Sequence, residues 1–202
     1  GHPCVTFHLD DAYGIAGEFF RWEFATAVAG KIMNINPFDE PNVTESKNNT
    51  ARLLEHYKQH GSLPKTEPML VEGGVSLYAD AHMSHLIGEL CYQHQYAHNT
   101  LGGMLASLIN SSQAGDYFAL LAYLPAFENV DEALENVRRR LRHTTRRAVT
   151  IGYGPRFLHS TGQLHKGGGD NGVFFQITYD DPADLAIPDA PYSFGVLKAA
   201  QA

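Results

Sequence analysis

The sequence contains little cysteine, a single tryptophan and no long apolar run. Its 202 residues include only two cysteines, Cys4 and Cys91, too few for a disulfide framework or a four-cysteine zinc site. No stretch approaches the roughly twenty apolar residues that a membrane-spanning helix needs. The N-terminus also lacks a basic region followed by an apolar core. The sequence therefore predicts no membrane partner and fits a cytoplasmic protein.

The chain also has no excess of basic charge, no internal repeat and no low-complexity segment. Its formal net charge of −7 argues against nucleic acid as a partner. With 44% hydrophobic and 18% charged residues it can bury a sizeable core. We expect a single domain over residues 1–202, with residues 62–82 as an internal linker or an excursion at the edge of the fold.

The second half of the chain alternates between strand and helix patterns. Residues 116–124 form a nearly continuous apolar run, typical of a strand buried on both faces. A helix over residues 130–147, a strand at 148–152 and a strand at 173–178 follow. This order predicts an α/β fold, a three-layer α/β/α sandwich around a mostly parallel sheet with residues 116–124 as a central strand.

The first half predicts mainly helices. We expect a strand at residues 3–9, then a helix capped by Asp10 or Asp11 whose apolar stripes are wide enough to predict burial. A second helix should run from Pro41 to Gly61, followed by a short hairpin around Gly73. Residues 82–111 read as one interrupted helix or two helices.

The stretch INPFDEPNVTESK, residues 35–47, combines a loop with a helix start. Pro41 suits a first helical position, and Asp39 or Glu40 would lie beside the positive helix N-terminus. Free backbone N–H groups and Lys47 could then face one anion or polarised oxygen. The alternative is a capped surface helix whose lysine is solvated.

A second stretch, residues 152–169, follows a predicted strand, and ligands of open parallel sheets bind beyond strand carboxyl ends. A histidine there could move a proton near neutral pH, and hydroxyl or amide groups could bind sugar or phosphate oxygens. The two histidines of this stretch are His159 and His165, and the alternative for His159 is a hydrogen-bonded structural role. The candidate binding residues are Ser160, Thr161, Gln163 and His165.

Both stretches resemble one enzyme family. Residues 38–47 are similar to the C-terminal Phe-Asp-Gln-x-x-Val-Glu-x-x-Lys signature of glucose-6-phosphate isomerases, and residues 17–30 resemble the helix before it. Residues 159–163 are similar to the segment that carries the family's ring-opening histidine. The likeness is strongest to bacterial fusions with transaldolase. Glu40 replaces the usual glutamine, and Thr44 stands where many members have glutamate.

The resemblance implies a sugar-isomerase domain that interconverts glucose 6-phosphate and fructose 6-phosphate without a cofactor. Lys47 would stabilise the developing oxyanion, and His159 would assist ring opening. In many relatives the histidine comes from a neighbouring subunit, so a homodimer is expected. The alternative is a non-catalytic module that binds sugar phosphate for regulation.

The family's Gln-Gly-Asp-x-Glu-Ser-like motif, which carries the catalytic base, is absent from this sequence. The Ser/Thr cluster that holds phosphate is absent as well. We therefore expect both in another part of a longer isomerase or transaldolase chain, and we expect these 202 residues alone to be inactive.

Four histidines, His82, His85, His94 and His98, include pairs at helical spacings that could chelate a metal. They lack a second pair of carboxylate or thiolate ligands, and the implied isomerase chemistry needs no metal. The sequence therefore predicts no metal site.

Overall fold

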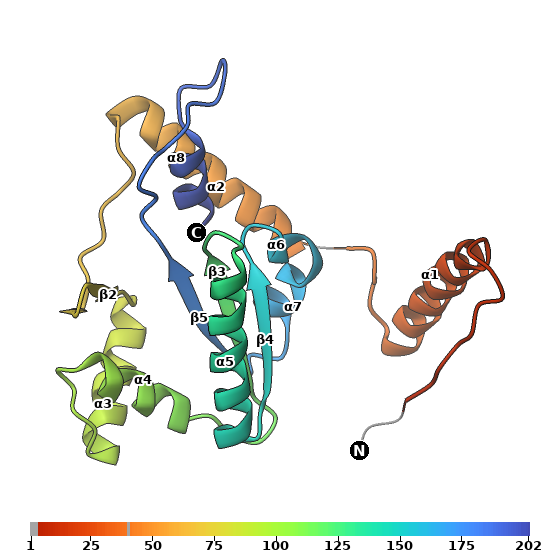
Figure 1. Ribbon diagram of the computed structural model, residues 1–202, viewed down its shortest axis with the longest axis horizontal. Helices are drawn as coiled ribbons and strands as arrows, with labels where there is room; N and C mark the ends of the chain where they lie inside the picture. The colour runs from red at the N-terminus through yellow and green to blue at the C-terminus, as the bar shows by residue number, and fades with distance from the viewer. Residues whose placement is uncertain (1–3, 40) are drawn as a thin grey trace. The chain divides into compact units, whose positions relative to one another are not determined.

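The computed structural model describes residues 4–39 and 41–202, and the chain divides at residue 40 into two compact units (Figure 1). The first unit holds helix α1, Gly14–Met33. The second holds all the strands and the remaining helices of the described chain. One domain over residues 1–202 stays a prediction.

Helix α1 begins and ends through local hydrogen bonds. The Asp11 Oδ1 atom accepts from the N–H of Gly14, the first residue of the helix, at 2.9 Å, but the N-cap position is held by Tyr13, which makes no side-chain capping bond. At the other end Asn34 adopts the left-handed conformation, with φ of 55°, and the Ile35 N–H donates to the Gly30 carbonyl at 3.0 Å.

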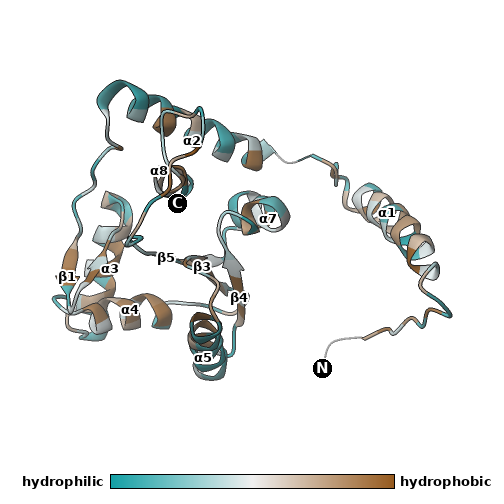
Figure 2. Ribbon diagram, turned by 45° about the horizontal axis from the view of Figure 1, so that its top comes forward, coloured by the Kyte–Doolittle hydropathy of each residue, from teal (hydrophilic) through white to brown (hydrophobic). Residues whose placement is uncertain are grey.

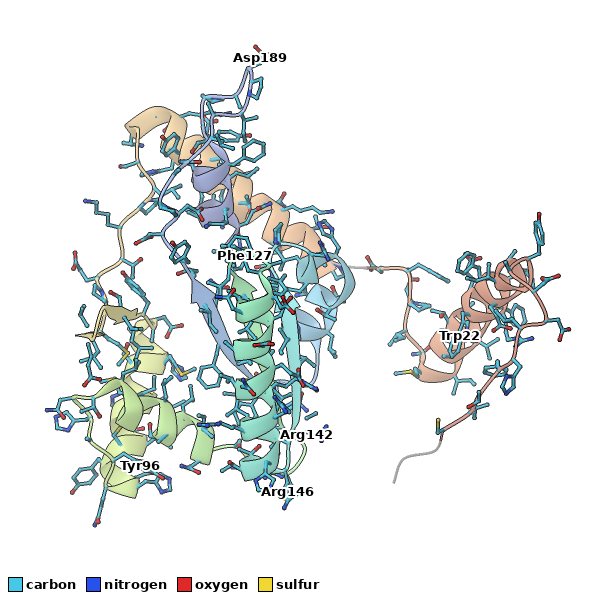
Figure 3. The ribbon with its side chains drawn as sticks, in the orientation of Figure 1. Trp22, Tyr96, Phe127, Arg142, Arg146 and Asp189 are labelled. Atoms are coloured by element: carbon cyan, nitrogen blue, oxygen red, sulfur yellow. The ribbon has the colours of Figure 1, made fainter. Side chains whose placement is uncertain are left out.

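Two predictions for this unit are wrong. Residues 4–9 form no strand, because a strand needs a hydrogen-bonding neighbour and residues 4–39 contain a helix but no other strand. The large apolar side chains of α1 are not buried within the unit either, since one helix has nothing to pack against: Phe20 is 70% exposed and Trp22 60% (Figure 3).

The second unit is built on a parallel three-stranded sheet. Its strands are β3 (Tyr117–Tyr123), β4 (Ala148–Tyr153) and β5 (Gly172–Thr178), in the order β4-β3-β5. Every residue of β3 after Tyr117 is buried, because both neighbours and both faces are covered. The predicted central strand is confirmed.

Helices pack against both faces of this sheet (Figure 2). On one face Phe118 and Leu120 form a core with Leu141 of α5 (Glu128–Thr145). On the other face Leu121 and Tyr123 pack with Phe157 of α6 (Phe157–Ser160), which is followed by α7 (Gly162–Gly167). The fold is thus mixed α/β with a small parallel sheet, and the full three-layer sandwich stays a prediction.

Helix α2, Pro41–His60, begins at the predicted proline and ends before Gly61, whose φ of +72° suits a glycine C-cap. The predicted hairpin is confirmed as β1 (Leu70–Glu72) antiparallel to β2 (Val75–Leu77). Gly73 and Gly74, both at positive φ, form its two-residue turn.

The predicted helical region of residues 82–111 consists of two helices. These are α3 (Ala81–His94), capped by Asp80, and α4 (Leu101–Asn110), capped by Thr100. They pack through a separate core that contains Ile87, Cys91 and Met104. The last helix, α8 (Phe194–Gln201), begins at Ser193. Over the residues described, none of the helices combines the length and apolar character that crossing a bilayer would require.

Candidate functional site

The start of α2 is joined to α7 by a pair of side-chain amides. The Asn42 backbone N–H donates to Gln163 Oε1 at 3.2 Å, and Gln163 Nε2 donates to Asn42 Oδ1 at 2.8 Å. Both hydrogen bonds are partly buried. In such a place a hydrogen-bonded amide stabilises the fold, whereas an amide without a partner lowers the stability. The two stretches singled out in the sequence therefore meet in the fold.

Close apolar packing extends this contact. Val43 is only 4% exposed and lies where a methyl group on Gly162 would be 3.5 Å from its Cγ2 atom. At Gly167 an added Cβ would lie 2.5 Å from Asn42 Oδ1 and 2.6 Å from Gln163 Nε2. This glycine thus lets the backbone of α7 approach the amide pair.

The His165 side chain of α7 contacts the sheet and lies among aromatic rings. Its Nδ1 atom is 2.8 Å from the Tyr117 hydroxyl, and the two rings stack with centroids 5.8 Å apart. Phe174 and Phe157 meet the imidazole edge to face, at 5.4 and 6.4 Å between centroids. The rings fix the orientation of His165.

Burial sets the ionisation of this pair. It lowers the pKa of His165 and raises the pKa of Tyr117, so both are neutral near pH 7. Among the hydrogen bonds of the described chain, the Tyr117 hydroxyl has His165 as its partner. If its proton is donated to Nδ1, the imidazole keeps its own proton on Nε2.

A pocket of about 230 Å³ opens beside this pair, at the edge of the sheet where β3 and β5 begin. Tyr117, His165 and Phe174 supply its aromatic lining, and Lys166 and Asp170 supply charge. Burial lowers the pKa of the Lys166 ammonium, while the nearby Glu45 carboxylate of α2 raises it. The first turns of α2 therefore influence the pocket electrostatically.

Lys47 and His159 have different surroundings from His165. Both are exposed, and in the described chain no hydrogen bond or ion pair joins them. His159 lies on α6, shortly after the carboxyl end of β4, whereas His165 contacts the first residue of β3. The two histidines of one predicted loop therefore lie toward opposite ends of the parallel strands.

The predicted binding residues are used in several ways. The Thr161 hydroxyl donates to the Phe157 carbonyl at 3.0 Å, and the Gln163 amide is occupied by Asn42. Ser160 ends α6. His165 alone of the four lines the pocket.

Tyr117 and Phe174 were not predicted as site residues, because each belongs to a stretch whose apolar pattern indicates a strand in the core. Tyr117 opens β3 shortly after a turn and precedes a buried run, whereas Phe174 is the third residue of β5 and lies on the exposed face of an alternating strand. Glu40, part of the family-like signature, lies outside the described residues.

Within residues 4–39 and 41–202 no three His, Cys, Asp or Glu side chains gather as a metal site would require. His85 instead lies 3.4 Å from the Glu89 carboxylate, one helical turn away. The chain matches no family model, no curated protein and no solved structure.

Proposed function

We propose that this chain is a sugar-isomerase domain of a cytoplasmic glucose-6-phosphate isomerase. The observation that carries the proposal is the reciprocal amide pair between Asn42 and Gln163. It joins the two stretches that resemble separate functional segments of that family, although 121 residues separate them. A chance likeness of either stretch gives no reason for the two to meet.

In this proposal Lys47 stabilises the oxyanion that develops during isomerisation, and His159 transfers a proton to the ring oxygen of the cyclic sugar. Both are exposed, so a ligand can reach them from solvent. The base that moves the proton between carbons, and the phosphate clamp, come from another part of the protein. The domain works without a cofactor, as part of a homodimer, and its fold is a three-layer sandwich.

The test is steady-state turnover in the protein with every domain that it carries in the cell. Lys47→Met should lower turnover about 10²–10⁴-fold on both open-chain and cyclic sugar phosphate, because the oxyanion forms from either. His159→Ala should affect the cyclic substrate most, since an open sugar bypasses its step.

Lys58→Met is the matched control, because Lys58 is an exposed lysine on the same helix whose partner is Glu55. Its turnover should stay within twofold of the parent protein. Full turnover of cyclic substrate by both the Lys47 and the His159 variants would exclude the proposed roles.

A second candidate is a non-catalytic module that binds sugar phosphate. One observation in its favour is that the Gln163 amide is hydrogen-bonded to Asn42 and so does not face a ligand. Another is that no hydrogen bond joins Lys47 and His159 in the described chain. Saturable calorimetric binding of fructose 6-phosphate by a protein with no turnover would support this module over the enzyme.

A further inference from the structure

The pocket at the start of β3 and β5 has the composition of a carbohydrate site. The Phe174 ring is 40% exposed although it belongs to a sheet strand, and it lines the pocket together with Tyr117. An aromatic face carries negative potential that attracts the polarised C–H groups of a sugar ring. Phe174 meets Tyr117 at 88°, so the two rings form a corner rather than a flat wall.

The polar groups of the pocket complement hydroxyl groups and a single anion. The Asp170 carboxylate can accept hydrogen bonds from sugar hydroxyls, and the Lys166 ammonium can pair with a phosphate. His165, held by Tyr117, adds a ring nitrogen whose orientation is fixed before any ligand arrives. Donors, acceptors and apolar surface thus converge on one small space, as in ligand sites generally.

The size of the pocket limits the ligand. The volume of the pocket is about 230 Å³. This is below the usual range of drug-sized sites, ~300–1,000 Å³, and suits one monosaccharide unit rather than an oligosaccharide or a nucleotide.

The backbone around the pocket is closely packed. Gly172 has no room for a Cβ because Phe174 and the Tyr117 hydroxyl lie against it. The Asn171 carbonyl accepts from the Tyr117 N–H at 3.0 Å, and its side-chain amide donates to the Gly115 carbonyl at 2.6 Å. Asn171, the neighbour of Asp170, is therefore hydrogen-bonded both to Tyr117 of β3 and to Gly115 before it.

We propose that this pocket binds one monosaccharide phosphate, with the sugar ring against Phe174, a hydroxyl on Asp170 and the phosphate on Lys166. The ligand class rests on the proposed function, whereas the location does not. The pocket is a binding site separate from the exposed Lys47 and His159, and it lies at the opposite end of the strands from His159.

The experiment is a titration of the 202-residue chain followed by the backbone amide resonances of Gly168, Gly169 and Gly172. The probes are glucose 6-phosphate, fructose 6-phosphate, glucose and inorganic phosphate, each up to millimolar concentration. Both sugar phosphates should shift these three resonances in a saturable way, and more tightly than glucose or phosphate alone.

Two variants separate the roles of the charged groups. Lys166→Met should weaken sugar phosphate binding about 10- to 100-fold, the worth of one charge-assisted hydrogen bond, and leave glucose unchanged. Asp170→Asn should weaken the binding of glucose and sugar phosphate but not of inorganic phosphate. It replaces one carboxylate oxygen by an amide donor, leaves a weaker uncharged acceptor for the sugar hydroxyl, and removes a charge that repels phosphate. Asparagine tolerates the φ of 53° at this position, so the loop should keep its shape.

Lys47→Met is the control that tests whether binding in the pocket depends on Lys47. This variant should bind sugar phosphate in the pocket with the same affinity as the parent chain. If Lys47→Met abolishes the shifts while Lys166→Met does not, the pocket proposal is wrong and the proposed function survives. If none of the probes moves the three glycine resonances, the pocket is not a sugar site, whatever the turnover measurements show. If only inorganic phosphate moves them, the monosaccharide assignment is likewise overturned.

Discussion

Gln163 of α7 and Asn42 at the start of α2 share two hydrogen bonds, at 2.8 and 3.2 Å, through one side-chain amide. One of them satisfies a backbone N–H in the first turn of α2, a group that has no partner within its own helix. Gln163 therefore acts as a cap supplied from another helix. The pair fixes where α2 starts relative to the sheet, and with it the position of Lys47.

Removing this amide should destabilise the second unit. We expect Gln163→Ala to lower the free energy of unfolding by about 1–2 kcal/mol, because two polar groups of Asn42 lose their partner in a partly buried place. Urea denaturation followed by far-UV circular dichroism measures the loss. Gln59→Ala is the matched control, since the Gln59 amide donates to Glu55 on the exposed side of α2 and should cost less than about 0.5 kcal/mol.

The single tryptophan, Trp22, belongs to the other unit. Its fluorescence should change with urea in the same way in both variants and in the parent chain. Equal losses from the Gln163 and Gln59 substitutions would show that the cap contributes no stability.

Gly167→Ala should act through the same pair. Its Cβ would lie within 2.6 Å of both amides, whose ends can move only by giving up their hydrogen bonds. We expect a loss of about 1–2 kcal/mol in the parent chain and much less in a Gln163→Ala background, where the pair is already broken. Gly169→Ala, whose Cβ would meet Asn171 at an ordinary 3.6 Å, should be tolerated.

The measurement is a double-mutant cycle by urea denaturation. Additive effects of the Gly167 and Gln163 substitutions would mean that the glycine is needed for a reason other than the amide pair.

Patterns that depend on neighbours in the sequence were predictable. The apolar run ending at Tyr123 gave the central strand because burial on both faces leaves no polar alternation. Pro41 and Gly61 marked the ends of α2, and Gly73 with Gly74 marked the hairpin, since each has a backbone preference that acts locally.

Features that depend on distant partners were not predictable. Residues 4–9 have a strand-like composition, but a strand also needs an edge to pair with, and their unit has none. The partner of His165 is Tyr117, which lies 48 positions away and at the amino end of its strand. The resemblance to the ring-opening segment ranked His159 first, although His165 is the histidine that the fold places in a pocket.

The core beneath the sheet allows a direct test of the fold. Phe118 is fully buried and stacks on Phe175 with ring centroids 6.2 Å apart, so Phe118→Ala should cost about 3–5 kcal/mol of unfolding free energy. The matched control is Phe127, which directly precedes α5 and is 63% exposed (Figure 3). Phe127→Ala should lower the unfolding free energy by less than about 1 kcal/mol. Thermal and urea unfolding measure both, and similar losses would contradict the assignment of β3 as the buried central strand.

Tyr123 should make the second unit sensitive to alkaline pH. Its side chain is 2% exposed and its hydroxyl donates to the Gln201 carbonyl at 2.7 Å, and burial raises its pKa to about 12. Because the unfolded chain ionises this phenol near its ordinary pKa of about 10, the neutral form favours the folded state. The resulting stability is complete below about pH 10 and is lost as the pH rises toward 12. Unfolding free energy measured in urea from pH 8 to 11.5 should therefore fall in the parent chain.

Tyr123→Phe should flatten that alkaline decline, at the cost of about 1 kcal/mol near pH 7 for the hydrogen bond to α8. Part of the decline should persist, because burial and the nearby Asp131 raise the pKa of Tyr153 to about 12 as well. Tyr92, 88% exposed, is the control: Tyr92→Phe should leave the pH dependence unchanged, since this side chain is not part of the core. If the Tyr123 variant declines as steeply as the parent chain, groups other than this buried phenol govern the alkaline unfolding.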